Sequence, residues 1–251
     1  MNINQFFQPE ENNLTGVSIE TALFNGFLLA SDAFSRTAYN SVYIIDVLQK
    51  TFLYVSDNPL FLCGHTASRV TAMGYRFFLK QVPQKDLELL FEINNAGVAF
   101  FSNLTVSERL LYCISYDFHL KQANQFELLI NHKVTPLILE ADGSIRYVMC
   151  VVSVSSQKKA GNLILRKKGE SFFYVYSQES KTGQKHEEKV LTEPEKLILH
   201  LSAQGNSMKT ISQRICLSPN TIKYHKRNIF QKLEVGTISE AISTAINHSI
   251  L

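Results

Sequence analysis

Residues 218–233 carry long polar side chains at helical spacing. In a helix drawn there with about 3.6 residues per turn, the side chains along one side are Asn220, Lys223, Tyr224 and Arg227. Ile222 and Ile229 fall on the opposite side. Lys, Arg and Asn carry the donors and acceptors that match base edges in the major groove of DNA. The pattern therefore predicts a helix with one buried face and one face that reads bases.

Side chains around this stripe have the chemistry to contact DNA phosphates, which position a helix without reading sequence. We assign this role to Lys209, Ser218, Thr221, Lys226 and Lys232. The charge distribution supports both assignments. Residues 196–233 hold seven Lys or Arg residues and no Asp or Glu, in a chain with 25 basic and 22 acidic residues. A basic run is often only a solvated face, but this one spans three separate helical segments.

The elements that must position these side chains are short helices with clear start signals. Thr192 with Glu195 three residues later predicts the start of a helix over residues 194–203. A second helix is expected over 207–214, and a third opens at Ser218, which is followed by proline in the first helical position. Together they predict a helix-turn-helix.

These motifs resemble the LuxR/GerE-type helix-turn-helix. The resemblance rests on Leu191-Thr192-x-x-Glu195, Gly205, Ile211-Ser212, Leu217-Ser218-x-x-Thr221-Ile222-Lys223-x-His225, and Asn228-Ile229-Phe230-x-Lys232-Leu233. It implies a four-helix DNA-binding domain over residues 191–251, whose third helix enters the major groove with Lys223, Tyr224 and Arg227 towards the bases. The fourth helix of that family, here about 237–247, often pairs two protomers.

Two positions depart from the family pattern. One is Ser212, where the family usually has Ala and where a small residue still fits. The other is Cys216, which stands in the turn before the third helix, where the family usually has Gly. A side chain at this point is expected to alter a tight turn.

The N-terminal part of the chain begins with an amphipathic helix over residues 18–34. Its apolar face is formed by Ile19, Leu23, Phe27, Ala30 and Phe34. We expect this face to cover the core of its own domain, with a dimer interface as the alternative.

Extended segments follow this helix. They are expected at 43–45, 52–56, 110–120, 127–140 and 145–155, with a helix over 86–101 and a further hairpin over 163–176. The order of these elements from residue 43 to about 155 resembles a PAS domain. The motifs that carry this resemblance are the junction at Asn58, Phe61-x-x-Gly64-His65, Val82-Pro83-x-x-Asp86, and Asp142-Gly143-Ser144-Ile145-Arg146-Tyr147.

The sequence therefore predicts an α+β protein, with a PAS-like antiparallel sheet flanked by helices and an all-α helix-turn-helix domain of four helices. The expected segments are an N-terminal helical segment (1–36), a PAS-like sensor domain (37–177), a polar linker (178–190) and the LuxR-type domain (191–251). The linker is expected because residues 177–189 contain no apolar side chain and cannot join a core.

Other chemistry is weakly supported. Asp57 lacks the acidic pair of a phosphoacceptor site and fits a helix cap with Asn58, and Cys63 lacks the surroundings of a flavin adduct and fits a buried thiol. His65 and His119 leave haem open but have no metal-ligand spacing. The four scattered cysteines favour a reducing compartment over a disulfide framework or a zinc site.

These observations predict a cytoplasmic, homodimeric, non-enzymatic transcription regulator without cofactor, metal or membrane segment. Its partners are expected to be double-stranded DNA and a small-molecule or protein signal. The alternative is a PAS module that binds a cofactor or small molecule, or is an enzyme, with DNA binding secondary. The sequence leaves open whether a dimer forms through the first helix, the sheet or the last helix.

Overall fold

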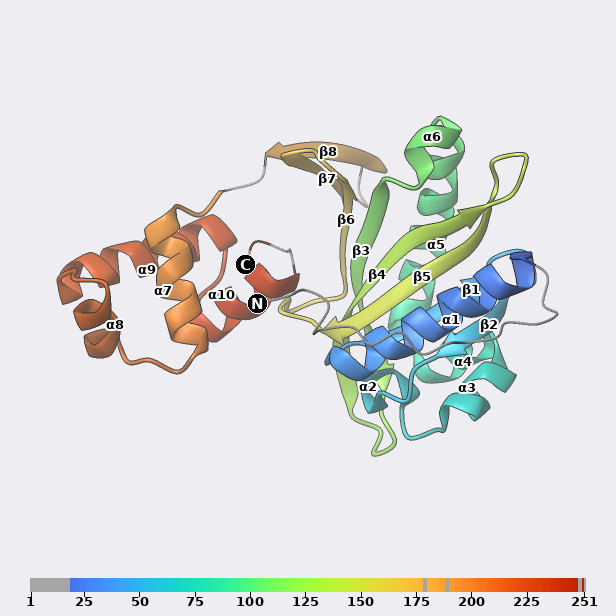
Figure 1. Cartoon of the computed structure of the whole chain (residues 1–251), viewed down its shortest axis with the longest axis horizontal. Helices are drawn as coiled ribbons and strands as arrows, with labels where there is room; N and C mark the ends of the chain where they lie inside the picture. Colours follow the sequence, from blue (N-terminus) through green and yellow to red (C-terminus); the bar gives the residue numbers. More distant parts are fainter. Residues whose placement is uncertain (1–18, 178–179, 188–189, 248–249, 251) are drawn as a thin grey trace, which may run out of the picture.

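Within the residues that the computed structural model describes (19–177, 180–187, 190–247 and 250), the N-terminal part of the chain forms one sheet of eight antiparallel strands (Figure 1). The strands are β1 (Ser41–Asp46), β2 (Thr51–Val55), β3 (Tyr112–Lys121), β4 (Glu127–Leu139), β5 (Ile145–Val154), β6 (Gly161–Lys167), β7 (Phe172–Ser177) and β8 (Thr182–Glu187). Their order in space is β2-β1-β5-β4-β3-β6-β7-β8. The first five strands give the PAS-like sheet that the sequence predicts, and the α+β fold class is confirmed.

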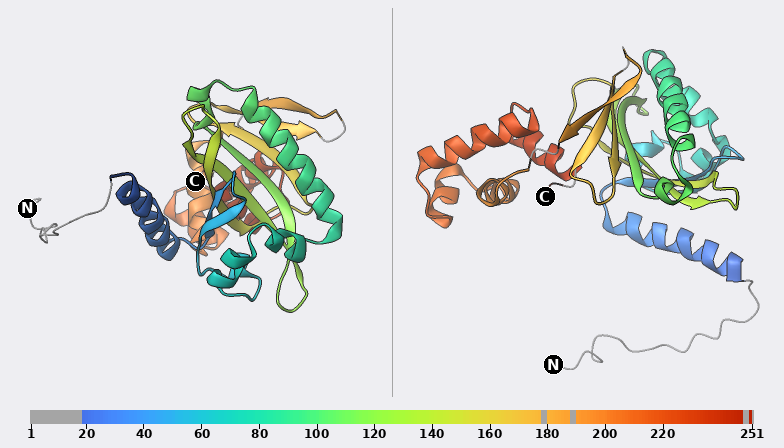
Figure 2. Two further views of the ribbon diagram at one scale, coloured as in Figure 1. Left: turned by 90° about the vertical axis from the view of Figure 1, so that its right-hand side faces the viewer. Right: turned by 90° about the horizontal axis from the view of Figure 1, so that it is seen from above.

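Helices lie on both faces of this sheet (Figure 2). One face carries α1 (Ile19–Thr37), and the other carries the helices between β2 and β3, which are α2 (Pro59–Leu62), α3 (Ala67–Met73), α4 (Arg76–Gln81), α5 (Gln84–Ser102) and α6 (Val106–Arg109). Two of these five were predicted individually from the sequence, namely the helix over 86–101, which is α5, and the short helix capped at Asn58, which is α2. All six residues of β1 are buried, because β1 lies between β2 and β5 and both of its faces are covered. We refer to the sheet with α1–α6 as the PAS-like domain.

Aromatic side chains fill much of the space between the sheet and α2–α4. The ring of Phe61 stacks on that of Tyr43 with 4.3 Å between centroids, and Phe77 lies 4.7 Å from Phe61. All three side chains are fully buried. Burying each Phe contributes roughly 1.5–3 kcal/mol to stability. Cys63 is buried beside them, as expected for a structural thiol, and its burial raises its pKa to about 12.

A buried histidine sits on the inner face of this sheet. Nε2 of His132 and the hydroxyl of Tyr43 form a hydrogen bond, and the imidazole packs against the rings of Tyr116 and Phe118 at 4.8 and 5.6 Å. Burial lowers the pKa of His132 to about 3, so the imidazole is neutral at physiological pH. Its Nδ1 has no hydrogen-bond partner among the described residues.

The first helix forms as expected, but the face predicted to cover the core does not do so in the described residues. Phe27 is 39% exposed and Phe34 is 50% exposed, while the side chains of residues 19–23 lie outside the described part. The helix instead contacts the sheet through Phe24, whose ring lies 5.5 Å from that of Tyr147, and through Ser35, whose hydroxyl is 2.8 Å from that of Tyr54. The alternative of a dimer interface stays a prediction.

The linker prediction for residues 178–190 is wrong for residues 182–187, which form β8. This strand pairs antiparallel with β7 from Phe172↔Glu187 to Ser177↔Thr182. Its side chains are all exposed, so the expectation that the segment adds nothing to a core still holds. A polar strand forms here because β7 offers a free edge of backbone donors and acceptors. Among the described residues, no helix has the length and apolar character needed to cross a bilayer.

The neutral state of His132 predicts that the PAS-like domain is less stable at mildly acidic pH. The pKa of this imidazole is about 3 in the folded chain and about 6.5 when unfolded, so the unfolded chain takes up a proton first. The stability gained by burying the neutral ring is complete above pH 6.5 and is lost between pH 6.5 and 3. Between pH 7.5 and 5.5 we expect a loss of about 1.4 kcal/mol from this group alone.

The measurement is the free energy of urea unfolding at both pH values, followed by the near-ultraviolet circular dichroism of the aromatic core. The control is the double variant His132→Leu with Tyr43→Phe, which removes the imidazole without stranding the hydroxyl. An equal pH dependence in the control would contradict the assignment.

Candidate nucleic-acid interface

The C-terminal part of the chain forms a separate helical body beside the sheet (Figure 1). Its helices in the described residues are α7 (Glu193–Ala203), α8 (Met208–Arg214), α9 (Pro219–Leu233) and α10 (Ile238–Asn247). Their starts lie within one residue of those predicted. The predicted capping box of Thr192 and Glu195 is present, and Ser218 accepts a hydrogen bond from Thr221 N at 3.1 Å. Pro219 occupies the first turn, where its missing N–H costs nothing.

The four helices share a small apolar core. Its fully buried members are Leu191, Ile198, Leu199, Ile211, Ile222, Ile229, Ala241 and Ala245. Ile222 and Ile229 come from α9 and lie seven residues apart, which places them two turns apart on one face. This confirms the buried face predicted for the third helix.

The opposite face of α9 is in water. Each of the four side chains proposed to read bases is exposed, namely Asn220, Lys223, Tyr224 and Arg227. Tyr224 is 60% exposed despite its large ring. The structure therefore brings these four side chains together on one accessible face, as the helical spacing predicted. A convex helix of this kind fits a major groove.

Comparison with known families decides what this body is. The family model of bacterial regulatory proteins of the luxR family matches residues 189–245. Residues 189–245 form a LuxR-family helix-turn-helix domain. Within this LuxR-family domain, α8 and α9 are the helix-turn-helix and α10 is the additional fourth helix.

A curated relative matches the same region. The Fimbriae Z protein of Salmonella typhimurium is 39% identical over 66 residues, which cover 26% of this chain and 31% of that protein. This chain thus matches about a third of the length of that relative.

Solved structures that match most of the chain are more distant. The complex of the phage VqmA with DPO has 15% identity and a TM-score of 0.30, and the match covers 92% of this chain and 89% of that one. The VqmA dimer of Vibrio cholerae has 12% identity and a TM-score of 0.31, with 93% and 89% covered. A PAS domain from Colwellia psychrerythraea has 11% identity and a TM-score of 0.38, with 53% and 97% covered.

The residues proposed to contact phosphates fall into three groups. Lys209 is exposed at the start of α8, and Lys226 is half-buried on the flank of α9. Ser218 and Thr221 lie at the start of α9, where their hydroxyls are 2.9 Å apart and serve the helix cap. All four stay predicted phosphate contacts. Lys232 differs from them.

The ammonium of Lys232 is engaged within the domain rather than directed at a ligand. It donates to Glu195 Oε2 at 2.7 Å and to the carbonyl of Val190 at 3.1 Å. The carboxylate of Glu195 is only 2% exposed and also accepts from Thr192 N at 2.8 Å. Burial raises the pKa of Glu195, but the hydrogen bonds from Lys232 and Thr192 outweigh it and leave the pKa lowered. We therefore withdraw Lys232 as a phosphate contact.

The ion pair between Lys232 and Glu195 was not predicted, because the sequence pattern indicates a structural role for Glu195 alone. The capping box identifies Glu195, but nothing local shows that its carboxylate also faces a side chain 37 residues away.

The strained turn before α9 was anticipated from the sequence. Cys216 has a φ of 54°, which is the left-handed region that favours glycine, so the family's usual Gly would fit here with less strain.

Lys232→Met is expected to destabilise the LuxR-family domain by about 2 kcal/mol, because it leaves the buried Glu195 carboxylate without its cation. The measurement is the thermal or urea unfolding of the full chain, followed by far-ultraviolet circular dichroism. Lys223→Met is the matched control, since Lys223 is exposed on the opposite face of the same helix, and it should change stability little. Equal stability of the two variants would return Lys232 to the list of candidate phosphate contacts.

Proposed function

We propose that this protein is a transcription regulator that binds double-stranded DNA by placing α9 in the major groove. The observation that carries the proposal is the exposed face of α9, where Asn220, Lys223, Tyr224 and Arg227 lie together on a LuxR-family domain. Lys and Arg side chains can bind guanine bidentately, and Asn can bind adenine. The ring of Tyr224 adds an apolar surface for a thymine methyl group.

Charge supports the same function. Of the seven basic residues between 196 and 233, Lys196 and Lys232 pair with Glu193 and Glu195, which lie just before this stretch. The other five add positive charge that favours contact with the phosphate backbone. We assign Lys209 and Lys226 to phosphates, together with the hydroxyls of Ser218 and Thr221. These contacts would fix the register of α9 without reading sequence.

The PAS-like domain is proposed to control this DNA-binding activity, either by sensing a small-molecule or protein signal or by holding two chains together. A homodimer would place two α9 helices about one turn of DNA apart, at the two halves of a symmetric site. We propose that the protein acts without an enzymatic step. We also propose a cytoplasmic location, where bacterial DNA lies and where the four cysteines, all free in the structure, would stay reduced.

Arg227→Ala is expected to cost roughly 1–3 kcal/mol of binding free energy and to relax the preference at one base position. Lys226→Ala is expected to weaken all DNA sequences alike and to reduce the slope of log K against log salt by about one, because one fewer counterion is released. The measurement is fluorescence anisotropy over a salt series, with a site selected from random DNA and a scrambled version of it.

Lys121→Ala, in the PAS-like sheet, is the control and should leave both affinities unchanged. If Lys226→Ala altered base preference and Arg227→Ala weakened all sequences equally, the assignment of the two faces would be reversed. If the full chain showed no salt-dependent affinity for any DNA, the proposed function itself would fail.

A further inference from the structure

The last helix of the LuxR-family domain ends against the sheet of the PAS-like domain (Figure 1). The backbone carbonyl of Asn247, the final residue of α10, accepts a hydrogen bond from Lys133 Nζ on β4. The side-chain amide of Asn247 accepts from Ser153 Oγ on β5 at 3.0 Å and donates to the carbonyl of Val154 at 3.4 Å. Two strands of one domain thus hold the end of a helix that belongs to the other.

The end of a helix is a place where such partners matter. Its last four carbonyls have no partner within the helix, and the aligned peptide dipoles leave a partial negative charge there. A cation in the last turn is the usual remedy, but α10 has no basic residue in its last turn. Lys133 supplies the missing cation from the sheet, 114 residues away in the sequence.

Lys133 is positioned for this contact by its neighbours in the sheet. It pairs with Ser115 of β3 on one side and with Val151 of β5 on the other, so its side chain leaves the face of the sheet opposite the core. The ammonium is partly removed from water. This burial lowers the pKa of Lys133, and the nearby Arg166 acts in the same direction while Cys113 opposes it. A desolvated ammonium needs an acceptor, and the end of α10 provides one.

We propose that the outer face of the sheet, at Lys133 and Ser153, is a docking surface for the C-terminal end of α10 and supplies the cation that the last turn of α10 lacks. This cation acts beside the backbone hydrogen bond from Ile250 N to the Ala245 carbonyl, at 2.8 Å. The stability of the last turn of the LuxR-family domain then depends on the PAS-like domain. Any displacement of β4 or β5 is transmitted to α10 through these bonds, without a contact to α9. This gives a physical route from the PAS-like domain to the DNA-binding body.

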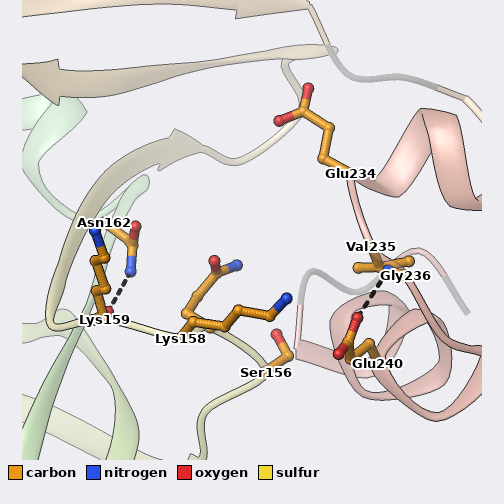
Figure 3. Close-up of a pocket in the computed structure, with 9 residues that line it drawn as sticks. Ser156, Lys158, Lys159, Asn162, Glu234, Val235, Gly236 and Glu240 are labelled. Carbon is orange, nitrogen blue, oxygen red and sulfur yellow. Dashed lines mark hydrogen bonds between the residues drawn. The ribbon is translucent and has the colours of Figure 1, made fainter.

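A polar cleft beside this contact adds to the attraction between the two bodies. It has a volume of about 260 Å³ and is lined from the sheet side by Lys158 and Lys159, and from the helical side by Glu234 and Glu240. In Figure 3 the side chain of Lys158 extends towards the turn that carries Gly236. Opposite charges across a cleft attract, and the attraction falls as salt is added.

The lysines of the cleft belong to a loop that is fixed to the sheet. Buried Asp117 accepts a hydrogen bond from Ser155 Oγ at 2.7 Å and another from Asn162 Nδ2 at 3.0 Å, and these residues bracket the loop on both sides. Its carboxylate also accepts from Asn131 Nδ2 at 3.1 Å. The docking surface and the cleft therefore sit on one rigid part of the sheet rather than on a free loop.

The test is hydrogen–deuterium exchange of the full chain in the absence of DNA, so that its outcome is independent of the proposed function. Lys133→Met should speed the exchange of amides 244–247 roughly three- to tenfold, because the last turn loses its cation and the hydrogen bond to the Asn247 carbonyl. Lys121→Met is the matched control on the neighbouring strand and should leave these amides unchanged. Lys133→Arg should restore most of the protection, since a guanidinium can also donate to the carbonyl.

Unchanged exchange at 244–247 in Lys133→Met, or an equal increase in Lys121→Met, would overturn the proposal. A second variant covers the case in which Lys133→Met loosens the whole sheet. Asn247→Ala leaves the sheet side chains intact but removes the bonds to Ser153 and Val154, and it should raise exchange in the last turn of α10 while β4 and β5 stay protected. No increase in that variant would also overturn it.

Discussion

The LuxR-family domain depends on one constraint, which is that α9 must bury one face completely while its opposite face stays in water. Ile222 and Ile229 meet this constraint by filling the centre of the small core. The far end of the helix is fixed differently, by the bond between Lys232 and the buried carboxylate of Glu195. Because Glu195 also caps α7, one carboxylate joins the start of the first helix of the domain to the end of the third. Rotation of α9 would break the apolar contacts and the ion pair together, so the exposed stripe is held in one orientation.

The PAS-like domain meets a related constraint with different chemistry. Its interior is built largely from aromatic rings, and its buried polar groups are kept neutral or multiply bonded. Inside, His132 is neutral and shares a hydrogen bond with Tyr43. On the opposite face of the sheet, the buried Asp117 carboxylate accepts from three uncharged donors. Burial raises the pKa of Asp117, although its hydrogen bonds oppose this. Such groups order a core geometrically at little gain in stability, because their desolvation offsets most of the bonding.

The two bodies are connected through their surfaces as well as through the chain. The contact at Asn247 is small, and a contact of this size can form and break without unfolding either body. It reaches the LuxR-family domain at α10, on the side away from the exposed face of α9, and so leaves that face accessible. The residues that complete α10 belong to the strands that also carry His132 and Cys150 on their inner face. The interior of the PAS-like domain and the end of α10 are thus separated by the thickness of a single sheet.

The sequence by itself determined the features that depend on near neighbours. Thr192 and Ser218 begin helices because their side chains bond to the backbone three residues on, and the stripe of α9 follows from a fixed helical period. The succession of strands along the chain, although not their order in the sheet, was also predicted from local turns and periodicity. Only the tertiary structure decided which face of α1 meets the sheet, that Lys232 serves Glu195, and that Lys133 completes α10. It also decided that β8 pairs with β7, since backbone hydrogen bonds require no side-chain pattern. These outcomes join residues far apart in the sequence, and which buried charge meets which partner depends on the packing of whole elements.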